Sequence, residues 1–252
     1  MLLHARQDGD VSTAAPNLPT PFDSTLGNNF TSPSCPEFFQ SFLTNSSFQS
    51  CLPLSLLLQT SNGFFMAAKS LVSLTQVLEA TCAADFNTCS PLMASLAQQL
   101  EQESNCGADL QMQNPTVLQA YDGLVAFQPL YQAGCLKDTD GAYCLANAMT
   151  NTSAPTSSYI YYLALGMQLP ANTRPACTDC LRNTMAIFAT AATNRSVPLN
   201  EDYTAAAQQV DASCGSEFAQ ASVVRSSAAQ QAAHMSKLVL MGFVVLAIEI
   251  LA

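Results

Sequence analysis

The chain has 252 residues, of which 49% are hydrophobic and only 10% are charged; 18 Asp and Glu outweigh 8 Lys and Arg, giving a net charge of −10. This length is sufficient for one sizeable hydrophobic core. Nucleic-acid binding needs clustered positive charge, and the sequence contains no run of Lys or Arg. We therefore expect one domain and no nucleic-acid partner.

Apolar residues recur at helical spacing from residue 34 onward. Capping residues such as Ser34 and Asn200 precede several of these stretches. The segment 157–169, rich in Tyr, is ambiguous between a strand and a short helix. The predicted helical stretches, in chain order, are 34–43, 61–82, 90–100, 114–135, 177–192 and 200–214. This pattern predicts an all-α fold, a disulfide-stapled bundle of six or seven short helices in a single domain.

Ten cysteines, an even number, are spread over the middle of the chain. Such a content is rare in reducing compartments without metal-binding motifs, so we predict five disulfides formed in an oxidising compartment. Spacing alone does not choose their pairing, although a small disulfide loop that closes the tight turn of CLKDTDGAYC, between Cys135 and Cys144, is favoured. The ten are Cys35, Cys51, Cys82, Cys89, Cys106, Cys135, Cys144, Cys177, Cys180 and Cys214.

Four N-x-[ST] sequons are consistent with secretion. They predict N-glycosylation at Asn29, Asn45, Asn151 and Asn194. In a chain rich in Asn, Ser and Thr some of these arise by chance, so they support secretion without establishing it.

The last fifteen residues, 238–252, are almost entirely apolar. As a helix this run spans about 22 Å, short of a hydrocarbon core of about 30 Å, and it includes Glu249. A polar spacer and a trio of small residues precede it, an order typical of a signal for a glycosylphosphatidylinositol (GPI) anchor. We predict attachment at Ser226, with Ser227 as the alternative, over an inserted helix or a buried one.

The sequence divides into four predicted regions. They are an unstructured leader over 1–28, the helical domain over 29–216, a stalk and GPI spacer over 217–237, and the hydrophobic tail over 238–252. The start, MLLHARQDGDVS, lacks the apolar stretch of a signal peptide. We therefore expect that the start has been mis-assigned or that the chain is already trimmed.

Little in the sequence indicates catalysis. The two histidines, His4 and His234, fall in the leader and the spacer, so the mature domain lacks a histidine base or ligand. The CTDC motif over 177–180 has the spacing of a redox pair, but structural bridges are favoured because no βαβ pattern surrounds it. We predict no catalytic residue, no metal site and no cofactor.

Acidic residues lie close together at three places, Glu101 with Glu103, Asp138 with Asp140, and Glu201 with Asp202. A glycosidase needs two facing carboxyl groups, but adjacent acids are more often a solvated surface. Asp138 and Asp140 also resemble part of a calcium loop, of which the remaining ligands are missing.

Several strings, among them TPFDSTLGNNFTSPSCPEFFQSFL, FQSCLPLSLLLQTSNGFF, LQAYDGLVAFQPLYQAGCL, LANAMTNTS and CTDCLRNTM, resemble an uncharacterised fungal family of secreted, GPI-anchored, ten-cysteine proteins known as domain of unknown function 7729. The resemblance covers residues 21–215. It implies display at a fungal cell surface and transfers no activity or catalytic residue.

Three functions follow as hypotheses. The first is a non-enzymatic binding or structural module, held on the outer leaflet of the plasma membrane or in the cell wall by its GPI anchor, with wall glycan as a candidate partner. The second is a carrier of an apolar ligand, a lipid or haem, in an interior cavity. The third is an enzyme that acts on wall glycans through two carboxyl groups.

Overall fold

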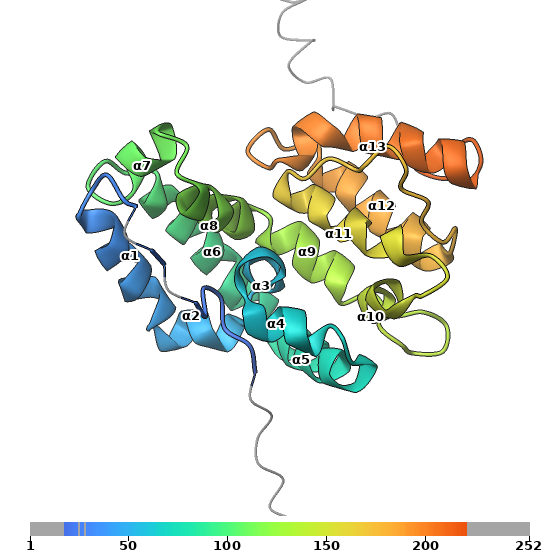
Figure 1. Cartoon of the computed structure of the whole chain (residues 1–252), viewed down its shortest axis with the longest axis horizontal. Coiled ribbons are helices and arrows are strands. Elements are labelled where there is room, and N and C mark those ends of the chain that lie inside the picture. Colours follow the sequence, from blue (N-terminus) through green and yellow to red (C-terminus); the bar gives the residue numbers. More distant parts are fainter. Residues whose placement is uncertain (1–17, 25, 28, 221–252) are drawn as a thin grey trace, which may run out of the picture.

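The described residues of the computed structural model, 18–24, 26–27 and 29–220, form thirteen α-helices and two short 3₁₀ helices (Figure 1). The only β pairing among them is one antiparallel bridge between Lys137 and Tyr143. The predicted all-α class and single domain are confirmed. The helices are α1 (Ser34–Leu43), α2 (Ser46–Cys51), α3 (Leu54–Thr60), α4 (Asn62–Ala67), α5 (Leu71–Ala83), α6 (Phe86–Leu100), α7 (Gly107–Gln111), α8 (Pro115–Val125), α9 (Phe127–Gly134), α10 (Cys144–Thr150), η1 (Pro155–Ser158), α11 (Tyr159–Tyr162), η2 (Leu163–Leu165), α12 (Asp179–Ala191) and α13 (Leu199–Cys214).

The helices outnumber the six or seven expected because local signals divide the longer stretches. The Ser70 side chain caps α5 by accepting a hydrogen bond from Ser73 N, which separates α4 from α5. Pro129 cannot donate to the preceding turn, and the chain bends at Ala126 to begin α9. The ambiguous segment 157–169 is helical as far as Leu165, with α11 flanked by η1 and η2.

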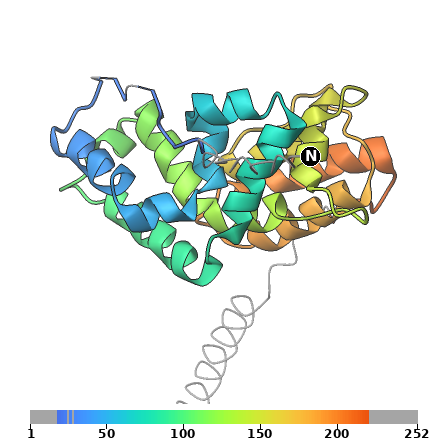
Figure 2. The same cartoon turned by 90° about the horizontal axis from the view of Figure 1, so that it is seen from below.

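Two hydrophobic cores lie side by side (Figures 1 and 2). The N-terminal core is built mainly by α1, α2, α6 and α8 and contains a cluster of Phe rings, in which Phe42 and Phe48 lie 5.1 Å apart. The C-terminal core is built by α4, α5 and α9 to α13 and is centred on Leu, Ala and Tyr residues. Most helices therefore bury their apolar face against one of two centres.

Helix α3 contributes side chains to both cores. In its sequence LSLLLQT the first five residues, four Leu and one Ser, are buried, so apolar side chains point in several directions. Leu56 packs in the N-terminal core, whereas Leu54 and Leu57 pack in the C-terminal core. Glycines let the neighbouring helices approach, since a Cβ at Gly123 of α8 or at Gly134 of α9 would collide with Leu56 or Leu54 respectively.

All ten cysteines are paired, which confirms the predicted disulfides. Two bridges lie within the N-terminal core, and three join helices around the C-terminal core. The bridges are Cys35–Cys106, Cys51–Cys89, Cys82–Cys135, Cys144–Cys180 and Cys177–Cys214.

The small loop expected to be closed by Cys135 and Cys144 is not closed by a disulfide. Cys135 bonds to Cys82 of α5 and Cys144 bonds to Cys180 of α12, and the turn between them is held by the β-bridge between Lys137 and Tyr143. The two cysteines of CTDC also bond to separate partners, Cys144 and Cys214. The motif is therefore structural.

The end of the expected unstructured leader packs against the domain. Asp23 accepts hydrogen bonds from Asn62 N at 2.8 Å and Gly63 N at 2.7 Å, at the start of α4. Burial opposes ionisation there, but the hydrogen bonds from Gly63, Asn62 and Ser61 outweigh it and place the pKa of Asp23 below its usual value. The Phe22 ring meets Phe39 edge to face at 5.2 Å. The packed chain thus begins well before residue 29.

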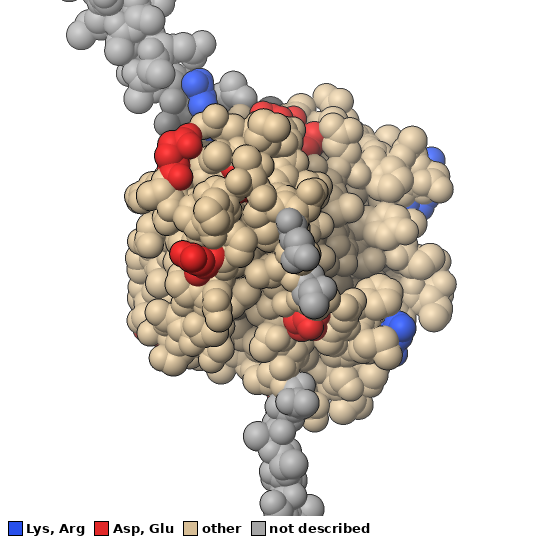
Figure 3. Space-filling view, turned by 60° about the vertical axis from the view of Figure 1, so that its left-hand side comes forward, with Lys and Arg blue, Asp and Glu red and all other residues tan. Residues whose placement is uncertain are grey.

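The surface carries few charges, as the face in Figure 3 shows. Three of the five Lys and Arg side chains among the described residues lie over aromatic rings: Lys69 over Phe65, Lys137 over Tyr143 and Arg182 over Phe218. Within the described part of the chain, no helix combines the length and the apolar character needed to cross a bilayer. The predicted tail over 238–252 lies outside that part.

Replacing the two glycines that face α3 should have unequal effects. Ala in a helix is favoured over Gly by about 1 kcal/mol. At Gly123 the new Cβ would also lie 2.9 Å from Leu56 Cγ and 3.3 Å from Leu56 Cα, so several Leu56 atoms would have to move. At Gly134 the new Cβ would collide with one terminal methyl of Leu54, and the next Leu54 atom, Cγ, is 3.8 Å away. We expect Gly123→Ala to lower the free energy of unfolding by about 2 kcal/mol and Gly134→Ala to leave it within about 1 kcal/mol. Urea denaturation with the disulfides intact measures both; equal effects would contradict this account of α3.

Candidate functional site

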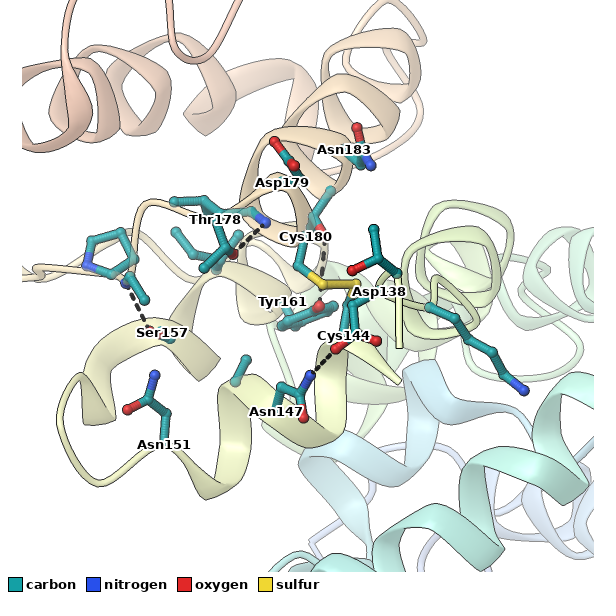
Figure 4. Close-up of a pocket in the computed structure, with 18 residues that line it drawn as sticks. Asp138, Cys144, Asn147, Asn151, Ser157, Tyr161, Thr178, Asp179, Cys180 and Asn183 are labelled. Carbon is teal, nitrogen blue, oxygen red and sulfur yellow. Dashed lines mark hydrogen bonds between the residues drawn. A yellow bond between two sulfur atoms is a disulfide. The ribbon is translucent and has the colours of Figure 1, made fainter. Parts of the chain in front are cut away.

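A cavity of about 490 Å³ opens between α10, α11 and α12 (Figure 4). Its walls come from four segments that are distant in sequence: the turn after α9, helix α10, the stretch from η1 to α11, and the residues that lead into α12. The Cys144–Cys180 bridge lies in the wall and ties α10 to α12. A volume of this size lies in the range of small-ligand sites.

Buried side chains form the floor of the cavity. Ile160, Leu181 and the ring of Tyr161 supply apolar surface, with exposed fractions of 1%, 7% and 3%. The Tyr161 hydroxyl lies 3.5 Å from Thr184 Oγ1, which donates to it. Burial raises the pKa of Tyr161 to about 12, so this hydroxyl is a neutral donor at physiological pH.

Exposed polar side chains form the rim. Thr178, Asp179 and Asn183 project from the first turns of α12, and Asn147 projects from α10 on the other side (Figure 4). Asn183 makes no hydrogen bond to other described side chains or backbone, so its amide is free to donate and accept. The combination of an apolar floor and an amide-rich and hydroxyl-rich rim suits a ligand with both C–H faces and hydroxyl groups.

Asp138 has a structural role at the edge of this cavity. Its Oδ1 accepts from Asp140 N at 3.0 Å and Ala142 N at 2.9 Å, and its Oδ2 accepts from Asn147 Nδ2 at 2.7 Å. These bonds shape the tight turn that the sequence predicted. They also orient Asn147 on α10.

Of the acidic residues considered for catalysis, Asp138 alone lines this cavity. Glu101, Glu103 and Glu201 are exposed. Asp202 accepts from Gln168 Nε2 at 2.9 Å. At the cavity itself, Asp179 is paired with Arg182 at 2.6 Å on the surface.

The carboxyl with a raised pKa lies elsewhere. Burial within α8 raises the pKa of Asp122 to about 6, and Asp122 does not line the cavity. Burial, followed by the nearby Glu101 and Asp122 carboxylates, raises the pKa of its neighbour Tyr121 to about 12. Among the described residues, no group of three or more His, Cys, Asp or Glu side chains is placed to hold a metal ion.

The four sequons lie on the surface. Asn29, Asn45 and Asn194 are exposed, and Asn151 is half-buried at the cavity. In three of them the Asn Oδ1 accepts from the N–H two residues on, at Ser47, Ser153 and Ser196, over 2.8, 2.9 and 3.0 Å. The predicted attachment residues Ser226 and Ser227 fall outside the described residues.

Two important polar residues were not singled out from the sequence. Asp109 is fully buried and accepts from Thr31 N at 2.6 Å and Ser32 N at 3.0 Å, which fixes the entry into α1. Asn183 is the free amide at the cavity rim. Neither belongs to a recognisable motif, so only the folded arrangement identifies them.

The fold and its five bridges define a disulfide-stapled all-α domain with a polar-rimmed cavity in its C-terminal half. Residues 17–223 match the family described as domain of unknown function DUF7729, and the chain belongs to this family. Comparison with curated proteins and with solved structures finds no match.

Neutralising Asp122 should change how stability depends on pH. The folded protein keeps the proton up to about pH 6, whereas the unfolded chain releases it near pH 4, so this group's contribution to stability is lost as pH rises between those values. We expect Asp122→Asn to raise the free energy of unfolding by about 1 kcal/mol at pH 7, since the carboxyl stays partly solvated, and to have a much smaller effect at pH 4. Urea titrations at both pH values test this, with exposed Asp140→Asn as the control. The same gain at both pH values would refute it.

Proposed function

We propose that this protein is a non-catalytic binding module displayed outside the cell, and that its cavity binds a hydroxyl-rich ligand of the fungal cell wall. The observation that carries the proposal is the pairing of a buried apolar floor with a rim of Asn147, Thr178 and Asn183. Sugars offer apolar C–H faces as well as hydroxyl groups, and amides both donate to and accept from hydroxyls.

The polar rim favours such a ligand over a lipid or haem. Asn147 and Thr178 already hydrogen-bond to Asp138 and to Leu181 N. An apolar ligand that covered the rim would leave the Asn183 amide without a partner, and a polar group buried unpaired costs about 1 to 3 kcal/mol. The carboxyl groups favour binding over hydrolysis. Asp138 is committed to three hydrogen bonds within its own turn, and Asp179 lies exposed beside Arg182.

Display outside the cell is supported by two independent features. Five disulfides are typical of an oxidising compartment. The small-residue trio, spacer and apolar run at 226–252 follow the order of a GPI signal. The proposed location is the outer face of the plasma membrane or the cell wall, with the lipid attached at Ser226 or Ser227.

Titration with soluble wall oligosaccharides tests the binding proposal. We expect tetramers of N-acetylglucosamine, β-1,3-glucose or α-1,6-mannose to include one that binds, and Asn183→Ala to weaken that binding about tenfold, the effect of one lost hydrogen bond. Asn183→Trp should abolish binding by filling the mouth of the cavity. Asn87→Ala, an exposed Asn on α6, is the matched control. No binding by any of the three sugars, or binding indifferent to Asn183, would reject the proposal.

Release from cells tests the anchor. In a fungal host, behind a functional secretion signal, the full chain should be freed from the cell surface by phosphatidylinositol-specific phospholipase C and should end at Ser226 or Ser227 by mass spectrometry. Deleting 238–252 should send the protein to the medium without the lipase. A cell-associated protein that retains its C-terminal fifteen residues would contradict the anchor.

A further inference from the structure

Asn151 differs from the other sequon residues in its position. It follows the last residue of α10, one turn beyond Asn147, and lines the cavity described above. The other three sequon Asn residues are exposed, whereas Asn151 is half-buried. In Figure 4 it lies at the edge of the cavity, with its amide nitrogen on the side of Ser157.

The orientation of the Asn151 amide is fixed by its own turn. Its Oδ1 accepts hydrogen bonds from Ser153 N and Ala154 N, both at 2.9 Å. With the oxygen held by two donors, the amide plane cannot rotate freely. The nitrogen Nδ2 donates to no other described group, and it is the atom that carries the sugar in N-glycosylation.

We propose that a glycan on Asn151 places its first sugar in this cavity, so that the protein occupies its own binding site. In the modification, Nδ2 displaces a diphosphate from C1 of an N-acetylhexosamine on a lipid-diphosphate donor and loses one proton. The inference rests on the proposed function, because the same rim and floor that suit a free sugar suit a tethered one.

Tethering makes even weak affinity sufficient. A group held by a short linker experiences an effective concentration of about 1 mM, so a site that binds free sugar with a dissociation constant of about 0.1 mM is about nine-tenths filled by its own glycan. Chains glycosylated at Asn151 then have a closed cavity, and chains left unglycosylated have an open one. Occupancy of this sequon therefore sets the fraction of protein that can bind external ligand.

The fold provides a variant that removes the glycan without disturbing the turn. Ser153→Ala destroys the sequon but keeps Asn151 and the backbone N–H that bonds to its Oδ1, and Ser153 itself is exposed. Ser47→Ala is the matched control, since it removes the Asn45 sequon from α2 at the other end of the molecule (Figure 1). Asn194 is a poorer control because it lines a second cavity.

Two measurements on full chains from a glycosylating host test the proposal. The first is the dissociation constant for the N-acetylglucosamine tetramer, which should fall at least tenfold in Ser153→Ala and stay unchanged in Ser47→Ala. The second is amide hydrogen exchange over 178–184, without added ligand, which should be slower in the parent and in Ser47→Ala than in Ser153→Ala.

The outcomes separate this inference from the proposed function. If hydrogen exchange over 178–184 is slower only in the forms that keep Ser153, and no form binds the tetramer, the result supports self-occupancy and counts against an external ligand. Equal tetramer affinity in all three forms with no difference in exchange overturns self-occupancy and leaves the binding function intact. Mass spectrometry that finds Asn151 unmodified in secreted protein also overturns it.

Discussion

The packing of α3 between two cores is the constraint on which the rest of this fold depends. Each disulfide staples helices around one core, and none crosses from one core to the other. The two halves are joined instead by close contact of α3 with α8 and α9, which Gly123 and Gly134 permit. Covalent bonds thus stabilise each half, while apolar packing sets how the halves sit together.

The cavity depends on both kinds of interaction. Its two walls, α10 and α12, are held by the Cys144–Cys180 bridge, and its edge is shaped by the hydrogen bonds of Asp138. The apolar floor belongs to the C-terminal core, since Ile160, Tyr161 and Leu181 pack there. The rim is therefore presented by a rigid scaffold, which lowers the entropic cost of binding.

Sequence patterns predicted the fold class and the longer helices because apolar residues at helical spacing report directly on a buried face. The stretch 177–192 corresponds closely to α12 and 200–214 to α13. Helix α3 was not predicted, because a segment buried on all sides has no polar face and hence no period. The packing of 18–24 was missed because its partners, at 39 and 61–63, are far away in sequence.

The candidate site was less predictable than the fold. Asn151 was recognised as a sequon and Asp138 as part of a tight turn, since both signals are local. Their meeting with Asn183 around one cavity arises from long-range packing and from a disulfide pairing that spacing did not determine. The expected small loop between Cys135 and Cys144 illustrates this limit, because nearness in sequence is a poor guide to which sulfurs meet.

The scarcity of basic side chains has a consequence for resistance to proteolysis. Five Lys and Arg residues lie between residues 18 and 220, but Pro175 follows Arg174, which leaves four positions for proteases that cut after Lys or Arg. At three of those four the side chain is engaged with Phe65, Tyr143 or Phe218. Cleavage requires a side chain to enter the protease and several backbone residues to become extended, which the surrounding helices and bridges oppose. Trypsin-like digestion should therefore proceed slowly until the sulfur bridges are reduced.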